Sequence, residues 1–177
     1  MKLRKKLIEK LFEWSQKLYL KFKKKEPWGI STAELLEFPF ESFGKKLGSF
    51  LHKNGFELIG KVERHDAYHV LTGFGTNVED EIALQYLCYG NGKRTPYLTG
   101  VLLLGTTILP EYFKYYYNSY LIGKQLNTFH HFDFKQLLHT DFECFRKMIF
   151  SEIQLKKLQQ LQYKYNEFQQ IPTSINI

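Results

Sequence analysis

Two histidines and two acidic residues in the middle of the chain have the types and the spacing of a metal-binding set. In a helix, His65 and His69 lie one turn apart on the same face, and Asp66 is an i,i+3 neighbour of His69. Imidazole nitrogens together with carboxylate oxygens bind divalent metals. Glu81 completes the set if a second helix begins shortly before it and runs back beside the first. The sequence therefore predicts a divalent-metal site between two consecutive helices.

The residues between the histidines and the more distant carboxylate favour a helix–turn–helix arrangement. Gly73 suits the left-handed residue that ends a helix. Thr76-x-x-Glu79 has the form of a capping box, which starts the next helix. We therefore expect one helix over about 62–72 and another over about 77–89.

The same residues have explanations that need no metal. Asp66 could fix the tautomer of a histidine, while Glu79, Asp80 and Glu81 complement the positive end of a helix dipole. The spacing also resembles the His-Glu-x-x-His of zinc proteases, but the shorter Asp66 stands where their general base is glutamate. A His-Asp phosphohydrolase would need another histidine on an earlier helix, and His52 is a poor candidate. Taken together, the glycine break and the acidic helix start favour the metal site.

The motif His65-Asp66-x-x-His69, followed by eleven residues and Glu81, is similar to the signature of the coenzyme Q (ubiquinone) biosynthesis "Coq-four" family. The similarity extends over about 38–149. The resemblance implies an all-helical fold in which these four residues hold a divalent metal, with zinc as the expected ion. It also implies a bound polyprenyl lipid or prenylated aromatic quinone precursor, and a location on the inner side of a membrane.

The activity that the resemblance implies is removal or replacement of the carboxyl group on a prenylated hydroxybenzoate. We expect the metal to orient a carboxylate or phenolate oxygen, with Asp66 or Glu81 as a catalytic base. The alternative is a non-catalytic lipid or quinone carrier that organises other quinone-biosynthesis proteins and in which the metal is structural. The chain differs from the ubiquinone-pathway members at Asp80, where glycine is common, and at Gln85 and Cys88.

Length and composition predict a single globular domain. The 177 residues are 44% hydrophobic and 17% aromatic, which argues against general disorder. Cys88 and Cys144 lack Cys-x-x-Cys spacing and indicate a reducing compartment. We expect a cytoplasmic, peripheral membrane protein with a single-domain all-α bundle of about seven helices. It should divide into a basic amphipathic helix (1–26), a helical domain (27–150) and a helical extension with a tail (151–177).

Positive charge is concentrated at the start of the chain. The first 25 residues hold ten Lys or Arg and two Glu, so the rest of the chain sums to about −1. An apolar stripe at helical spacing runs through the same segment: Leu3, Leu7, Leu11, Trp14, Leu18 and Phe22. Such a helix can lie on an anionic membrane surface, or it can pack its stripe on the domain. Nucleic acid is not an expected partner, because no aromatic or Arg-rich reading element accompanies the helix.

Three further segments are expected to shape the core. In a helix over about 41–53, Gly44 and Gly48 would let another backbone approach closely. The apolar segment 98–109 is too short to span a bilayer and is predicted to be a buried central helix beside which an isoprenoid chain could lie. The last long helix continues over 151–170 with a partial apolar stripe that packs on the domain or on a second subunit, so a homodimer is one expected assembly.

Overall fold

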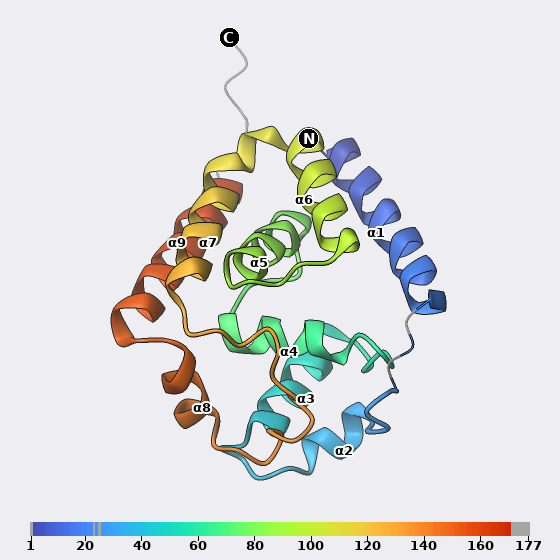
Figure 1. Ribbon diagram of the computed structural model, residues 1–177, viewed down its shortest axis with the longest axis vertical. Coiled ribbons are helices and arrows are strands. Elements are labelled where there is room, and N and C mark those ends of the chain that lie inside the picture. Colours follow the sequence, from blue (N-terminus) through green and yellow to red (C-terminus); the bar gives the residue numbers. More distant parts are fainter. Residues whose placement is uncertain (1, 23, 25, 171–177) are drawn as a thin grey trace.

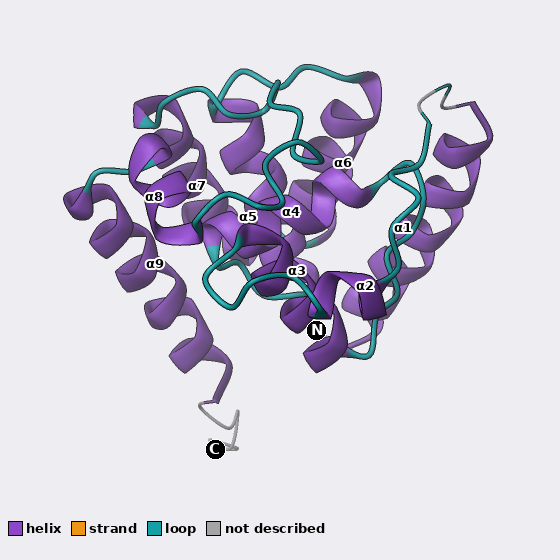
Figure 2. Cartoon of the chain, turned by 90° about the horizontal axis from the view of Figure 1, so that it is seen from below, coloured by secondary structure: helices purple, strands orange, loops and turns teal. Residues whose placement is uncertain are grey.

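The computed structural model describes residues 2–22, 24 and 26–170 of the chain, and they form an all-helical single domain as predicted (Figure 1). Lys23 and Lys25 of the basic segment lie outside the described residues, as does the tail after residue 170. Figure 2 shows helices joined by loops and, over the described ranges, no strand. The elements are α1 (Lys2–Phe22), α2 (Thr32–Leu36), α3 (Phe43–Asn54), α4 (Glu63–Thr72), α5 (Val78–Gly90), α6 (Pro96–Ile108), the 3-10 turn η1 (Pro110–Tyr112), α7 (Phe113–Gln125), α8 (Phe142–Ile149) and α9 (Glu152–Gln170).

The predicted last long helix is in fact two helices, and the described ranges hold nine α-helices where about seven were expected. After α8, Phe150 is extended, with φ −118° and ψ 133°, and its side chain is buried. The Oγ of Ser151 then accepts a hydrogen bond from the backbone N–H of Gln154, whose side-chain oxygen accepts one from the Ser151 N–H. This reciprocal cap starts α9 as a new helix.

α5 lies at the centre of the bundle, between α4, α6 and α7 (Figure 1). Its crossing with α7 is close because each helix has a glycine at the contact. A Cβ atom at Gly123 would collide with the backbone carbonyl of Leu87, and one at Gly90 would collide with that of Tyr120. This close approach brings the aromatic side chains of α7 against the buried face of α5.

The predicted close approach at the glycines of α3 is confirmed. A Cβ at Gly48 would lie 2.8 Å from the Cβ of Leu35 and 2.9 Å from its carbonyl carbon, and Gly44 is similarly crowded. The helix begins later than predicted because the Oγ of Ser42 caps it by accepting a hydrogen bond of 3.1 Å from the backbone N–H of Lys45.

The prediction that 98–109 is a buried central helix is wrong for one of its faces. α6 packs one face on α5, where Gly105 lies against Ile82, and it also contacts α1. The side chains of Leu103 and Leu104 are 65% and 53% exposed, because no described element covers the opposite face. None of the helices in the described ranges is long and apolar enough to cross a membrane.

α1 does not pack its predicted apolar stripe on the domain. The buried Ile8 lies on another face of the helix, and two positively charged side chains attach the helix to the domain. The guanidinium of Arg4 donates two hydrogen bonds, of 2.8 and 3.1 Å, to the Glu111 carboxylate, and the ammonium of Lys5 lies 2.7 Å from Glu79. The stripe residues left more than one-third exposed are Leu3, Leu7, Trp14, Leu18 and Phe22.

Candidate metal centre

The predicted turn between the two motif helices is present, but its cap differs from the prediction. Gly73 follows the last residue of α4 and has a φ of 74°, as expected for a left-handed helix end. The predicted capping box of Thr76 and Glu79 is wrong. Asn77 occupies the position before α5 and makes no side-chain cap. The Glu79 carboxylate is instead fully buried against Lys5, so it cannot turn back to cap the backbone.

Three of the predicted ligands meet between α4 and α5. The Nε2 of His65 lies 3.1 Å from one carboxylate oxygen of Glu81, and the Nε2 of His69 lies 3.1 Å from the other. One ligand atom from each residue lies within 4.8 Å of the other two, so the group could hold a metal ion. The His69 side chain is 2% exposed, whereas those of His65 and Glu81 are 31% and 23% exposed. The site is therefore buried on the His69 side and partly open on the other.

Asp66 lies beside this group rather than within it. Its Oδ1 is 4.0 Å from the Nδ1 of His65, on the edge of the ring opposite the nitrogen that faces Glu81. A carboxylate at the second nitrogen of a metal-binding imidazole commonly orients the ring and raises its basicity. A direct role for Asp66 as a fourth ligand stays a prediction.

The hydrogen bonds of His69 indicate which of its nitrogens is available to a metal. Its Nδ1 lies 3.1 Å from the backbone carbonyl oxygen of Phe74. A carbonyl can only accept, so Nδ1 carries the hydrogen and donates it. The lone pair of Nε2 in that tautomer would face a Glu81 oxygen 3.1 Å away, where one cation can contact both atoms. The donor set therefore fits a metal.

The charges of the metal-free group favour its ionised form. Burial lowers the pKa of His65, but the nearby carboxylates of Glu81 and Asp66 outweigh it and raise the pKa to about 9. Burial likewise raises the pKa of Glu81, but the two imidazoles outweigh it and hold that pKa well below its usual range. In the metal-free protein, protons thus supply the positive charge that a metal would bring, and binding of a metal must displace them.

The three consecutive acids at the start of α5 have three different partners. Glu79 pairs with Lys5 of α1, Asp80 accepts a hydrogen bond of 2.7 Å from the hydroxyl of Tyr115 on α7, and Glu81 faces α4. Burial raises the pKa of the Asp80 carboxyl. If all three acids merely complemented the helix dipole, they would be interchangeable. Each acid instead has its own partner, which contradicts that alternative.

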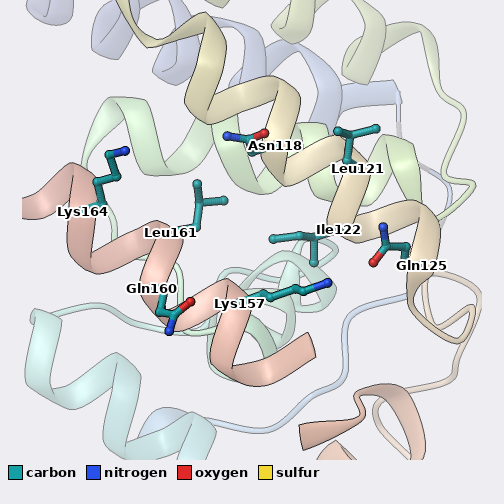
Figure 3. A pocket seen from close by; sticks show the side chains of 8 residues that line it. All are labelled: Asn118, Leu121, Ile122, Gln125, Lys157, Gln160, Leu161 and Lys164. Atoms are coloured by element: carbon teal, nitrogen blue, oxygen red, sulfur yellow. The ribbon is translucent and has the colours of Figure 1, made fainter. Parts of the chain in front are cut away.

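Two surface grooves lie away from the metal group. One, of about 400 Å³, lies between α7 and α9, and Figure 3 shows side chains of the two helices facing one another across it. The other, of about 260 Å³, lies beside α8. Neither is lined by the metal group or by the 98–109 segment, so an isoprenoid site along that segment stays a prediction. The first groove is lined by Asn118, Leu121, Ile122, Gln125, Lys157, Gln160, Leu161 and Lys164.

Comparisons with known proteins give a family match and a similar fold. Residues 60–160 match the family model of the coenzyme Q (ubiquinone) biosynthesis protein Coq4, a segment that includes α4, α5 and the metal group. The fold is similar to the crystal structure of a protein from Nostoc punctiforme PCC 73102 that is provisionally assigned to ubiquinone biosynthesis. The TM-score is 0.57 at 21% identity, over 70% of this chain and 69% of the other, which shows a shared fold. No curated protein shows a significant match.

Proposed function

The chain belongs to the coenzyme Q (ubiquinone) biosynthesis protein Coq4 family, and on this premise we propose that it is a metal-dependent decarboxylase of a prenylated hydroxybenzoate. The observation that supports a catalytic metal is the uneven burial of the three-residue group. Catalytic zinc sites use three protein ligands and keep a further position open, whereas structural sites are closed. His65, His69 and Glu81 supply three ligands, and the partial exposure of His65 and Glu81 leaves one side accessible.

In this proposal His65, His69 and Glu81 hold a divalent ion, zinc being the first candidate. The bound ion would supply a Lewis acid for a carboxylate or phenolate oxygen of the substrate. The carboxylates of Asp66 and Glu81 lie at the two nitrogens of His65. We assign proton transfer during the reaction to one of these two carboxylates.

The proposed reaction breaks the bond between the aromatic ring and its carboxyl carbon. The electron pair of that bond stays on the ring carbon, carbon dioxide leaves, and a proton takes its place. In the oxidative form, dioxygen and a two-electron donor instead place a hydroxyl group on this carbon and release water. The two forms differ in product, so the product identifies which one occurs.

We further propose that the protein works on the inner, anionic face of a membrane, where a prenylated substrate resides. α1 supports this, since it combines a large positive charge with an apolar stripe that faces away from the domain. The half-exposed Leu103 and Leu104 of α6 add apolar surface. Association there would be peripheral and would use α1 as the contact.

A second candidate is a non-catalytic carrier or organiser of quinone-biosynthesis proteins with a structural metal. The nearly complete burial of His69 favours it, as does the position of both described grooves away from the metal group. In this second candidate the ion would hold α4 against α5 and would take no part in a reaction.

Turnover by the full-length protein separates the two candidates. Zinc-loaded protein is mixed with a prenylated hydroxybenzoate carrying a carboxyl carbon-13 label, in detergent micelles, with and without dioxygen and a reductant. We expect the wild type to release labelled carbon dioxide, to stop releasing it on chelation and to release it again when zinc is added. Asp66→Asn should release little labelled carbon dioxide. The control Glu57→Gln, a change at an exposed acid, should release as much as the wild type. Zinc-loaded protein that binds the labelled lipid but releases no carbon dioxide would support the organiser.

A further inference from the structure

The C-terminal helix α9 contacts the end of α4, the helix that carries both histidines. The side-chain amide of Gln162 donates a hydrogen bond of 3.0 Å to the backbone carbonyl of Thr72, the last residue of α4. Carbonyl groups in the last turn of a helix have no partner within the helix. Gln162 supplies that partner one turn after His69 and packs beside Gly73, where a Cβ would lie 3.6 Å from its side-chain oxygen. It thereby ties α9 to the C-terminal end of α4.

The same helix also reaches α5 through two aromatic side chains. The rings of Tyr165 and Tyr115 are stacked, with centroids 4.4 Å apart and planes at 21°. The hydroxyl of Tyr115 donates its 2.7 Å hydrogen bond to Asp80, which directly precedes Glu81. The other oxygen of Asp80 packs against the turn between the motif helices, where a Cβ at Gly75 would lie 2.6 Å from it. Tyr115 and Asp80 are both buried, so this chain of contacts leaves little room for the start of α5 to move.

We propose that Gln162 and Tyr165 are positioning residues of the metal centre. The ligands lie on two separate helices, so their separation depends on how α4 is held against α5. α9 contacts the end of one helix directly and the start of the other through Tyr115, and so fixes His69 and Glu81 at a metal-binding distance. Both positioning residues lie beyond the segment that matches the family. The inference rests on the proposed function, because it assumes that the group binds a metal.

Zinc affinity of the full-length protein tests this inference. Metal-free protein is titrated with zinc in competition with a chromogenic chelator, and cobalt spectra report the geometry of the site. Loss of a residue that orients metal ligands typically weakens metal binding by about 10- to 100-fold. We expect about 10-fold weaker binding and an altered cobalt spectrum in Gln162→Ala and in Tyr165→Ala. Tyr165→Phe keeps the stacked ring and should bind zinc like the wild type.

Gln159→Ala, at an exposed position of α9, is the matched control and should also bind zinc like the wild type. Tyr165→Leu, which removes the ring but stays apolar, replaces Tyr165→Ala if that variant does not fold. Wild-type affinity in both Gln162→Ala and the Tyr165 variant that lacks the ring would overturn the inference.

A second measurement distinguishes failure of this inference from failure of the proposed function. The ring N–H that His69 donates to Phe74 should give a slowly exchanging proton resonance in the metal-free protein. We expect Gln162→Ala and the Tyr165 variant to shift it or to speed its exchange. If the wild type binds no zinc, the proposed function fails, and this resonance then tests only whether Gln162 and Tyr165 position His69: an unchanged signal in both variants overturns that role, and a changed one supports it.

Discussion

The Nε2 of His65 and a carboxylate oxygen of Glu81 lie 3.1 Å apart, although the two residues belong to different helices. The second oxygen of the same carboxylate contacts His69, so one side chain of α5 is held between two imidazoles of α4. Without metal the contact is an ion pair, and with metal all three groups would bind the cation. Loss of Glu81 therefore removes a partner from both histidines at once.

Glu81→Gln should lower the bound zinc to the level of His69→Ala, within a few-fold. The substitution keeps the size of the side chain but removes the charge that a divalent ion needs, and either loss leaves an incomplete set of ligands. Atomic emission on purified protein measures the metal. Glu57→Gln, at an exposed acid, is the control and should retain it. If Glu81→Gln retains as much bound zinc as the wild type, Glu81 is not a ligand. If His69→Ala also retains that amount, the metal hypothesis is wrong.

The stabilising effect of His65 in the metal-free protein should depend on pH. Its pKa in the folded protein is raised to about 9, so the protonated ring favours the folded state. This contribution is complete below the ordinary histidine pKa of 6.5 and is lost as the pH rises through about 9. Urea unfolding of chelated wild type and His65→Gln should therefore show a free-energy difference that shrinks over this range. A difference that stays constant with pH would contradict the assignment.

The meeting of His65, His69 and Glu81 could be predicted from the sequence because its geometry is local. Helical periodicity alone puts His65 and His69 on one face, and Gly73 indicates where the first helix ends. The failure of the predicted capping box could not be seen in the same way, because it depends on a contact outside the motif. Glu79 decides the matter through its pairing with Lys5, a residue distant in sequence.

The rotation of α1 could not be predicted from its periodicity. A repeat of apolar residues identifies a face but not what covers it. Here the ion pairs of Arg4 and Lys5 turn Ile8 toward the core and the predicted stripe outward. The hydrogen bond of Gln162 to Thr72 was missed for a similar reason, since a side chain that binds a distant backbone carbonyl leaves no pattern in the sequence.

The pairing of Lys5 with Glu79 should contribute substantially to stability. The Glu79 side chain is 0% exposed, and one of its oxygens has no partner among the described groups, so Lys5→Met would leave a buried charge without compensation. Removal of one partner of a buried ion pair costs about 3–5 kcal/mol, and we expect the lower end because Lys5 is 24% exposed. Urea unfolding measures the loss.

The double variant Lys5→Met/Glu79→Gln is the matched control for that prediction. It removes both charges, so it should unfold at higher urea than Lys5→Met alone. Equal midpoints for the single and double variants would show that the buried charge of Glu79 is not what destabilises Lys5→Met.

Binding to anionic vesicles should depend on the outward face of α1. Trp14 is 65% exposed and Trp28 is buried, so the blue shift of fluorescence on adding vesicles should come from Trp14. The double variant Leu7→Ser/Leu18→Ser removes two exposed leucines of the stripe. Complete burial of a leucine side chain contributes a free energy of about 1.5–3 kcal/mol. Since burial at an interface is partial, we expect about 10-fold weaker partitioning. Salt should weaken wild-type binding by screening the lysines. Ile153→Ser, at a more exposed position on α9, is the control. Partitioning as strong in the double variant as in this control would rule out α1 as the membrane contact.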